Sequence, residues 1–160
     1  MRPENTWGKL FPAGLALASL LLSTSLQASF QTDYDKALAT FRSAKAHADY
    51  EAAASMFAAL TSRKDAGSLQ ANSLFWLAEC YYGLKDYVRA LNCFERVLLL
   101  PRSNKEEDSR YKVAVCYIKL GWNDAARWEL TRFLRDYPAS PKADLVRKEL
   151  NKLPPAASGN

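Results

Sequence analysis

The feature that most constrains this fold is a pattern of small and large apolar residues that occurs twice, 36 positions apart. Apolar residues recur every three or four positions in both copies, which predicts amphipathic helices. A period of this length is typical of stacked helical units rather than of one irregular core. The matched pairs are Leu74/Arg110, Leu77/Val113, Ala78/Ala114, Cys80/Cys116, Tyr81/Tyr117, Ala90/Ala126 and Phe94/Leu130.

A glycine and an aspartate interrupt the apolar pattern in the middle of each copy, at Gly83 and Asp86 and again at Gly121 and Asp124. Both residue types favour a turn that ends one helix and starts the next. Each copy therefore predicts two antiparallel helices. The matched alanines predict where those helices cross closely, because a larger side chain would push them apart.

A third, weaker copy lies upstream, where Asp49, Ala53 and Phe57 match the middle copy at a spacing of 37. Its first helix lacks the pattern, which is expected of a terminal repeat that has only one neighbour. Downstream, Ser140 as N-cap and Pro141 at the first helical position predict one more helix. The apolar face of that helix predicts a cap on the last repeat.

Together these residues resemble the tetratricopeptide repeat (TPR), whose pattern is W-x2-L-G-x2-Y, then A-x3-F and a late proline. The resemblance implies an all-α fold, an α-solenoid of about three helix–turn–helix repeats with a C-terminal capping helix. We expect a TPR domain at 29–153, with repeats at 34–67, 71–104 and 107–140. The capping helix is expected at 141–153 and a disordered tail at 154–160.

The junction "RDYPASPKAD" and the period near 36 make the chain similar to exported bacterial TPR proteins of the cell envelope. Two groups of that class are similar. One contains the cell-division coordinators associated with the Tol–Pal system, and the other is the lipoprotein subunit of the outer-membrane β-barrel assembly machine. The resemblance implies a place in the cell envelope and a protein or peptide partner there.

Residues 1–28 predict a secretory signal peptide. Arg2 and Lys9 precede an uncharged run from Leu10 to Leu26, and the small Ala28 offers a cleavage site. Cleavage there would release the mature chain into the periplasm. The alternative is that the apolar run stays attached as a membrane anchor.

The mature chain would contain three cysteines, Cys80, Cys93 and Cys116. An odd number argues against a full disulfide framework, and the spacings do not fit a zinc site. Packed helices stand roughly 8–10 Å apart, which keeps Cys80 and Cys116 beyond disulfide reach. We expect buried free thiols, while a bond from Cys93 to either of the others stays open.

The sequence offers no catalytic constellation. His47 is the single histidine and lies beside a predicted turn, where surface exposure is more common than catalysis. The chain contains no glycine-rich phosphate loop, no H-E-x-x-H and no G-x-S-x-G. Glu106, Glu107 and Asp108 start a predicted helix and complement its dipole, which explains them better than a metal does. We therefore expect no enzyme, no cofactor and no metal.

A partner would bind the concave side, which the first helices of successive repeats line. We call this surface the inner groove. Its aromatic and aliphatic residues would form an apolar strip with polar flanks, which suits an extended or helical peptide. The alternative is that some of them pack on the signal-proximal segment or the capping helix. The inner groove comprises Arg42, Asn72, Phe75, Glu79, Tyr82, Asp108, Tyr111, Val115, Ile118 and Lys119.

Positive charge gathers near the C-terminus, where residues 110–152 contain ten basic and five acidic side chains. Such a surface could meet an acidic protein or an anionic membrane surface, and the alternative is a set of solvated helix faces. Nucleic acid is not expected after export, and membrane contact would be peripheral unless the signal stays attached. This basic surface comprises Arg132, Arg135, Arg147, Lys148 and Lys152.

These observations lead to two hypotheses. The first is an exported, non-enzymatic TPR adaptor that binds a protein or peptide partner of the cell envelope. The second is a structural subunit that associates mainly with itself, because an exposed aromatic strip could pair across a two-fold axis.

Overall fold

The computed structural model describes residues 12–63, 69–101 and 103–155, with side chains from residue 24 onward. Within these ranges every regular element is a helix, which confirms the predicted all-α class. The helices are α1 (Pro12–Ser43), α2 (His47–Thr61), α3 (Gln70–Gly83), α4 (Tyr87–Leu98), α5 (Glu106–Leu120), α6 (Asn123–Asp136) and α7 (Ala143–Lys152).

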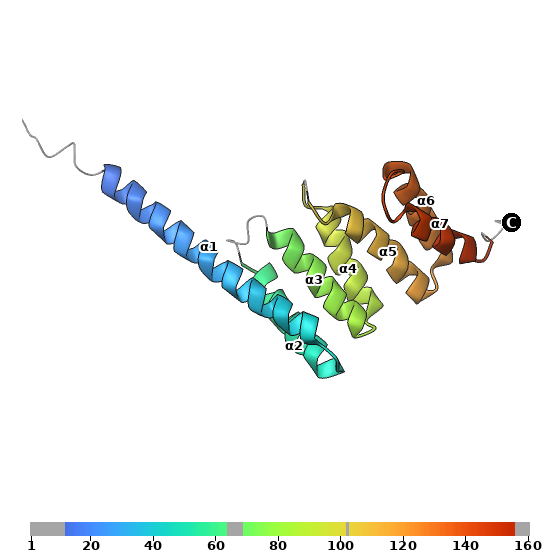
Figure 1. Cartoon of the computed structure of the whole chain (residues 1–160), viewed down its shortest axis with the longest axis horizontal. Coiled ribbons are helices and arrows are strands. Elements are labelled where there is room, and N and C mark those ends of the chain that lie inside the picture. Colours follow the sequence, from blue (N-terminus) through green and yellow to red (C-terminus); the bar gives the residue numbers. More distant parts are fainter. Residues whose placement is uncertain (1–11, 64–68, 102, 156–160) are drawn as a thin grey trace, which may run out of the picture.

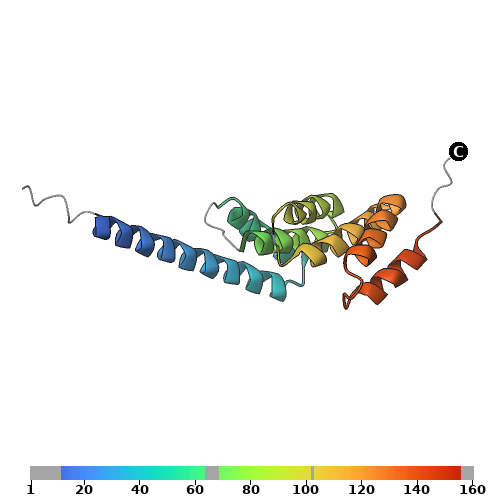
Figure 2. The same ribbon diagram turned by 90° about the horizontal axis from the view of Figure 1, so that it is seen from above.

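The helices stack in chain order, so that each packs mainly against the one before it and the one after it. Figure 1 shows this progression from α2 to α7. Seen from above, α4 lies on the opposite side of α3 from α1 (Figure 2). Packing between successive helix pairs is the architecture of an α-solenoid, so this prediction is also confirmed.

Helix α1 runs without a break from Pro12 to Ser43, and its N-terminal half extends away from the stack (Figure 1). Its C-terminal half packs through Phe30, Tyr34 and Ala37, which are all buried. The helix continues through Ala28, where cleavage of the signal peptide remains a prediction. Residues 1–11 of the predicted signal lie outside the described residues. None of the described helices combines the length and the apolar character that a membrane crossing requires.

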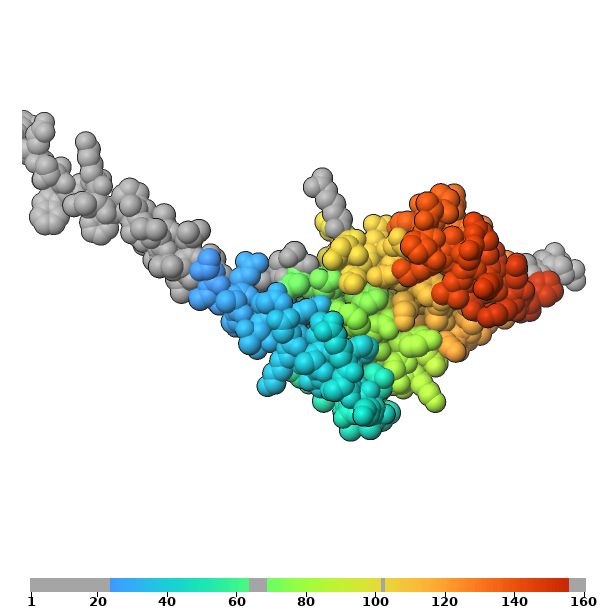
Figure 3. Space-filling model, in the orientation of Figure 1, coloured from blue at the N-terminus to red at the C-terminus, as the bar shows by residue number. Residues whose placement is uncertain are grey.

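Helix α7 packs on α6 at the C-terminal end of the stack, where Figure 3 shows it in red. It begins at Ala143 rather than at Pro141, because Ser140 serves the turn ahead of the helix. The Ser140 hydroxyl accepts a hydrogen bond from the Lys142 N–H at 3.0 Å and donates one to Glu107 at 2.6 Å. Residues 156–160 of the predicted tail lie outside the described residues.

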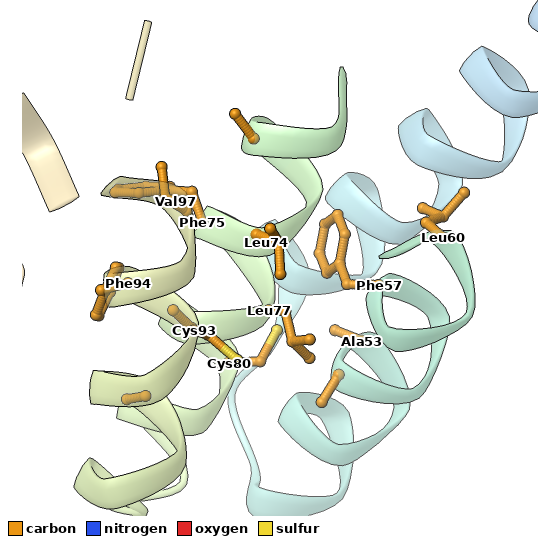
Figure 4. Close-up of a cluster of buried hydrophobic side chains, with 14 of the residues drawn as sticks. Ala53, Phe57, Leu60, Leu74, Phe75, Leu77, Cys80, Cys93, Phe94 and Val97 are labelled. Carbon is orange, nitrogen blue, oxygen red and sulfur yellow. The ribbon is translucent and has the colours of Figure 1, made fainter. Parts of the chain in front are cut away.

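The largest core extends from α1 to α5 and includes buried residues of α2, α3 and α4. Phe57 and Phe94 are fully buried at 0% exposure, and Leu77 between them is 4% exposed. Figure 4 shows Leu77 of α3 facing Ala53 of α2, while Cys93 approaches from α4. All four alanines that the repeat predicts at helix crossings are fully buried, as close approach requires: Ala78, Ala90, Ala114 and Ala126.

The turns between paired helices use a left-handed residue at the same place in two repeats. Lys85 has φ 59° between α3 and α4, and Gly121 has φ 74° between α5 and α6. Glycine adopts this conformation freely, whereas a residue with a Cβ is strained there. The middle repeat therefore retains a lysine at a position where its backbone is unfavourable.

Gly83 marks a second close approach, at the last residue of α3. A Cβ built on Gly83 would lie 2.7 Å from the ring of Tyr50 on α2. Real Cβ atoms essentially never come so close, so only glycine leaves the ring in place. Lys119 stands 36 positions later and is exposed, which shows that the glycine serves the α2–α3 contact and not the repeat in general.

Candidate functional site

Helices α3 and α5 carry most of the predicted inner groove, and the structure buries its first aromatic residue. Phe75 is 6% exposed, and its ring centroid lies 5.4 Å from that of Trp76 and 5.5 Å from that of Phe94. The Lys105 ammonium lies 5.0 Å from the centre of the Phe75 ring. Phe75 therefore belongs to the core and presents no side chain to a partner in this conformation.

An ion pair joins α3 and α5 in the middle of the inner groove. The Lys112 ammonium donates to the Glu79 carboxylate at 2.9 Å and lies 4.9 Å from the centre of the Tyr82 ring. Burial raises the pKa of Tyr82 above its ordinary value. No prediction from the sequence included Lys112. It stands 33 positions after Glu79, which is about one helical turn less than the repeat of 36.

A second ionic cluster joins the start of α5 to the segment before α7. The Lys142 ammonium lies 2.7 Å from the Asp108 carboxylate and 3.6 Å from that of Glu107. Lys105 reaches Asp108 from the other side at 3.9 Å. The hydrogen bond to Asp108 raises the pKa of Lys142 above its ordinary value. Asp108 is half-buried and pairs with Lys105 and Lys142 of the same chain.

The remaining apolar residues of the inner groove are half-buried on α5. Tyr111 and Ile118 pack against a small second core that consists of Ala114, Leu130, Phe133 and Val146. The Tyr111 ring centroid lies 6.4 Å from that of Phe133. Val115 is half-buried as well.

The polar ends of the inner groove differ in exposure. Arg42 and Lys119 are exposed near the C-terminal ends of α1 and α5. Asn72 is half-buried, and its side-chain oxygen is buried without a hydrogen-bond partner. The structure therefore joins the central groove residues of α3 and α5 through the Lys112 ion pair, while Arg42 and Lys119 stay at the surface.

Most of the predicted basic surface is paired with carboxylates of its own helices. The shortest ion-pair distances are Arg132 to Asp136 at 3.5 Å, Arg135 to Asp136 at 2.9 Å, Arg147 to Asp144 at 2.7 Å and Lys152 to Glu149 at 3.0 Å. Lys148 is the member for which the described residues supply no ion partner. Local pairing reduces the positive field that a partner would feel.

The groups considered for chemistry do not gather in one site, because His47 lies at the surface and the cysteines are buried. His47 has a side chain that is 69% exposed, and its imidazole lies 3.6 Å from Glu51. The described residues contain no cluster of potential metal ligands. All three cysteines are free and buried, as expected, and burial raises the pKa of Cys80 and of Cys116 to about 12. Such thiols are not activated nucleophiles.

The helix stack is matched by one family of repeat proteins. The model of the family described as "Anaphase-promoting complex, cyclosome, subunit 3" matches residues 46–132, which extend from the start of α2 into α6. Repeats of this TPR-like type are generally non-enzymatic scaffolds for protein–protein interaction. The chain is also similar to a "UPF0162 protein" of Xylella fastidiosa (strain 9a5c), with 36% identity over 75 residues. That match covers 46% of this chain and 26% of the relative, so the chain spans about a quarter of that protein.

Proposed function

Because the chain belongs to the family described as anaphase-promoting complex, cyclosome, subunit 3, we propose that it is a non-enzymatic scaffold that binds a protein or peptide partner. The observation that supports this most directly is the stack of paired helices, which presents long helical faces and no catalytic constellation among the described residues. The inner groove on α3 and α5 is the proposed binding surface. Its accessible centre is Tyr82, Val115 and Ile118, with Lys119 at its edge.

Site-specific photo-crosslinking tests this surface. A photoreactive phenylalanine analogue is placed at Val115 or Lys119 on the inner face of α5, and at Thr131, an exposed position on α6, as the control. The proposal expects a discrete crosslinked protein from the two inner positions and none from the control. Equal capture from all three positions would remove the inner groove from the proposal.

We place this scaffold in the bacterial cell envelope, following the composition of residues 1–28 and the similarity to exported TPR proteins of the Tol–Pal type. Its partner would then be an envelope protein. N-terminal sequencing of the protein recovered from its native cell tests the export step. A chain that begins at Ser29 supports cleavage, an intact N-terminus in the membrane fraction supports an anchor, and an intact N-terminus in the cytosol contradicts the envelope assignment.

Self-association is the second candidate function, and one observation favours it. Val88, Leu99, Trp122 and Trp128 lie on or beside α4 and α6 and are between 52% and 82% exposed. Exposed tryptophans are common anchors of protein interfaces. Sedimentation equilibrium of the full chain decides this point: a dimer that Trp128→Ser converts to monomer supports it, and a monomeric wild type contradicts it.

A further inference from the structure

A groove between α2 and α4 lies on the other side of α3 from the inner groove, and no prediction from the sequence included it. It has a volume of about 550 Å³. We call it the outer groove. Its floor includes Leu77 of α3, which Figure 4 shows between α2 and α4. Its lining includes Ala58, Tyr81, Arg89, Asn92, Cys93 and Arg96.

The charges of the outer groove have one sign. Arg89 and Arg96 line it, and none of its lining residues is acidic. The Arg89 guanidinium stacks on the Tyr81 ring at 4.4 Å and pairs at its rim with Asp86 at 2.5 Å. Arg96 is exposed, and within the described ranges no carboxylate pairs with it. The groove therefore offers one free guanidinium and one partly engaged guanidinium above an apolar floor.

The next repeat shows what fills the equivalent space. There the Tyr117 hydroxyl donates to the Glu95 carboxylate at 3.1 Å, across the gap between α5 and α4. Burial and the Glu95 charge raise the pKa of Tyr117 to about 12, which keeps the donor protonated. Tyr117 is the counterpart of Tyr81, so a carboxylate against this tyrosine is a contact that the repeat can form.

The outer groove lacks that carboxylate because of one substitution between repeats. At the spacing of 37 that relates α2 to α4, the counterpart of Glu95 is Ala58. The alanine side chain neither fills the space beside Tyr81 nor offers a hydrogen-bond acceptor to its hydroxyl. Arg89 and Arg96 line the same space, so the outer groove can accept a carboxylate from outside the chain.

We propose that the outer groove binds a segment of a partner protein that presents a glutamate or aspartate side chain in the place Glu95 occupies one repeat later. The carboxylate accepts from the Tyr81 hydroxyl and lies between Arg89 and Arg96. An apolar neighbour in the same segment covers Ala58 and the buried Cys93. This inference rests on the proposed scaffold function and adds a second surface with a defined partner chemistry.

The experiment titrates the ¹⁵N-labelled full chain with the peptide acetyl-Ala-Leu-Glu-Glu-Leu-amide and follows backbone amide shifts. The control peptide carries glutamine in place of both glutamates. We expect saturable shifts at the end of α2 and along α4 with the acidic peptide, and none with the control peptide. Shifts confined to α3 and α5 at Glu79 and Val115, or no shift along α4, would overturn the proposal while leaving the inner groove untouched.

Variants separate specific binding from general attraction. Arg96→Gln should weaken peptide binding about tenfold, because it removes the free cation. Lys36→Gln makes the same charge change at an exposed position of α1, outside the outer groove, and should leave binding unchanged. Equal weakening by both variants would show general electrostatics and overturn the proposal.

Two further variants test the vacancy itself. Ala58→Glu should fill the groove from within and abolish the shifts, while Glu95→Ala should create a second response around Tyr117. Ala58 is half-buried and Glu95 is exposed on the helix surface. Circular dichroism confirms that both variants are folded before titration. Undiminished binding by Ala58→Glu would overturn the assignment of the carboxylate to this space.

Discussion

The middle and last repeats place opposite chemistry at equivalent buried positions. Leu74 and Cys93 are 2% and 4% exposed in the middle repeat. Their counterparts 36 positions later are Arg110 and Glu129, at 7% and 8% exposure, with 3.8 Å between guanidinium and carboxylate. The comparison shows that the repeat requires a buried side chain at each of these two positions. An apolar pair meets this requirement in the middle repeat, and an ion pair meets it in the last repeat.

The ion pair of the last repeat belongs to a longer chain of contacts. Arg110 also reaches Glu106 at 3.4 Å, and the Tyr137 hydroxyl donates to Glu106 at 3.1 Å. Arg132 approaches Glu129 at 4.0 Å from the solvent side. A buried pair of this kind adds little net stability, but removal of one partner leaves a buried charge without compensation. The last repeat is therefore the more vulnerable region.

The largest expected effect breaks this pair. Arg110→Leu alone should lower the free energy of unfolding by about 3–5 kcal/mol, because Glu129 would stay buried without its main partner. Arg110→Leu with Glu129→Cys copies the middle repeat and should recover most or all of that loss. Urea unfolding of the three proteins measures both. If the single and double variants were equally unstable, the two repeats would not be interchangeable at these positions.

The next effect concerns the close approach between Gly83 and the Tyr50 ring. Gly83→Ala should destabilise the chain by about 1–2 kcal/mol, because its Cβ would displace the Tyr50 ring and overpack the α2–α3 contact. Lys119→Ala at the equivalent, exposed position should change stability by less than about 0.5 kcal/mol. Thermal unfolding compares the pair. A stabilised Gly83→Ala variant would mean that helix propensity outweighs the contact.

A smaller effect exchanges the left-handed turn residues. Lys85→Gly should stabilise the chain by about 1 kcal/mol, since glycine removes the strain at φ 59°. Gly121→Lys should destabilise it by a similar amount, about 1 kcal/mol, because φ 74° becomes strained. Denaturant midpoints of both variants measure the exchange, and two shifts of the same sign would contradict the assignment of strain.

The smallest effect is a pH dependence confined to the last repeat. Burial raises the pKa of Glu129 above its ordinary value, although Arg110 acts in the opposite direction. The folded chain therefore binds this proton more tightly than the unfolded chain does. Stability associated with protonated Glu129 is fully present below the unfolded pKa and is lost as pH rises through the folded pKa.

Glu129→Gln removes this titration. The free energy of unfolding of the wild type, measured relative to that of the variant, should fall as pH rises from about 4.5, the ordinary carboxyl range. Urea unfolding at successive pH values gives the difference between the two proteins. A difference that is constant across that range would show that Glu129 keeps the same pKa in both states.

The sequence predicted the fold because period, matched alanines and turn residues all indicate the same stack of helices. It predicted less of the site, since exposure depends on how helices pack in depth. Phe75 has the spacing of a groove residue, yet it lies against Trp76 and Phe94 in the core. Lys112 was missed because its partner lies on another helix. The alignment of Arg110 with Leu74 was visible, but nothing local to it indicates a buried ion pair.

The order of packing along the stack has a consequence for how the molecule comes apart. Because each helix rests mainly on its two chain neighbours, the fold behaves as a row of coupled units and not as a single block. Opening can start at an end and stop at any junction between units. The outermost unit, with its buried charges and short α7, can open while the apolar centre between α2 and α4 stays closed. The chain can thus expose one end of its surface at a time.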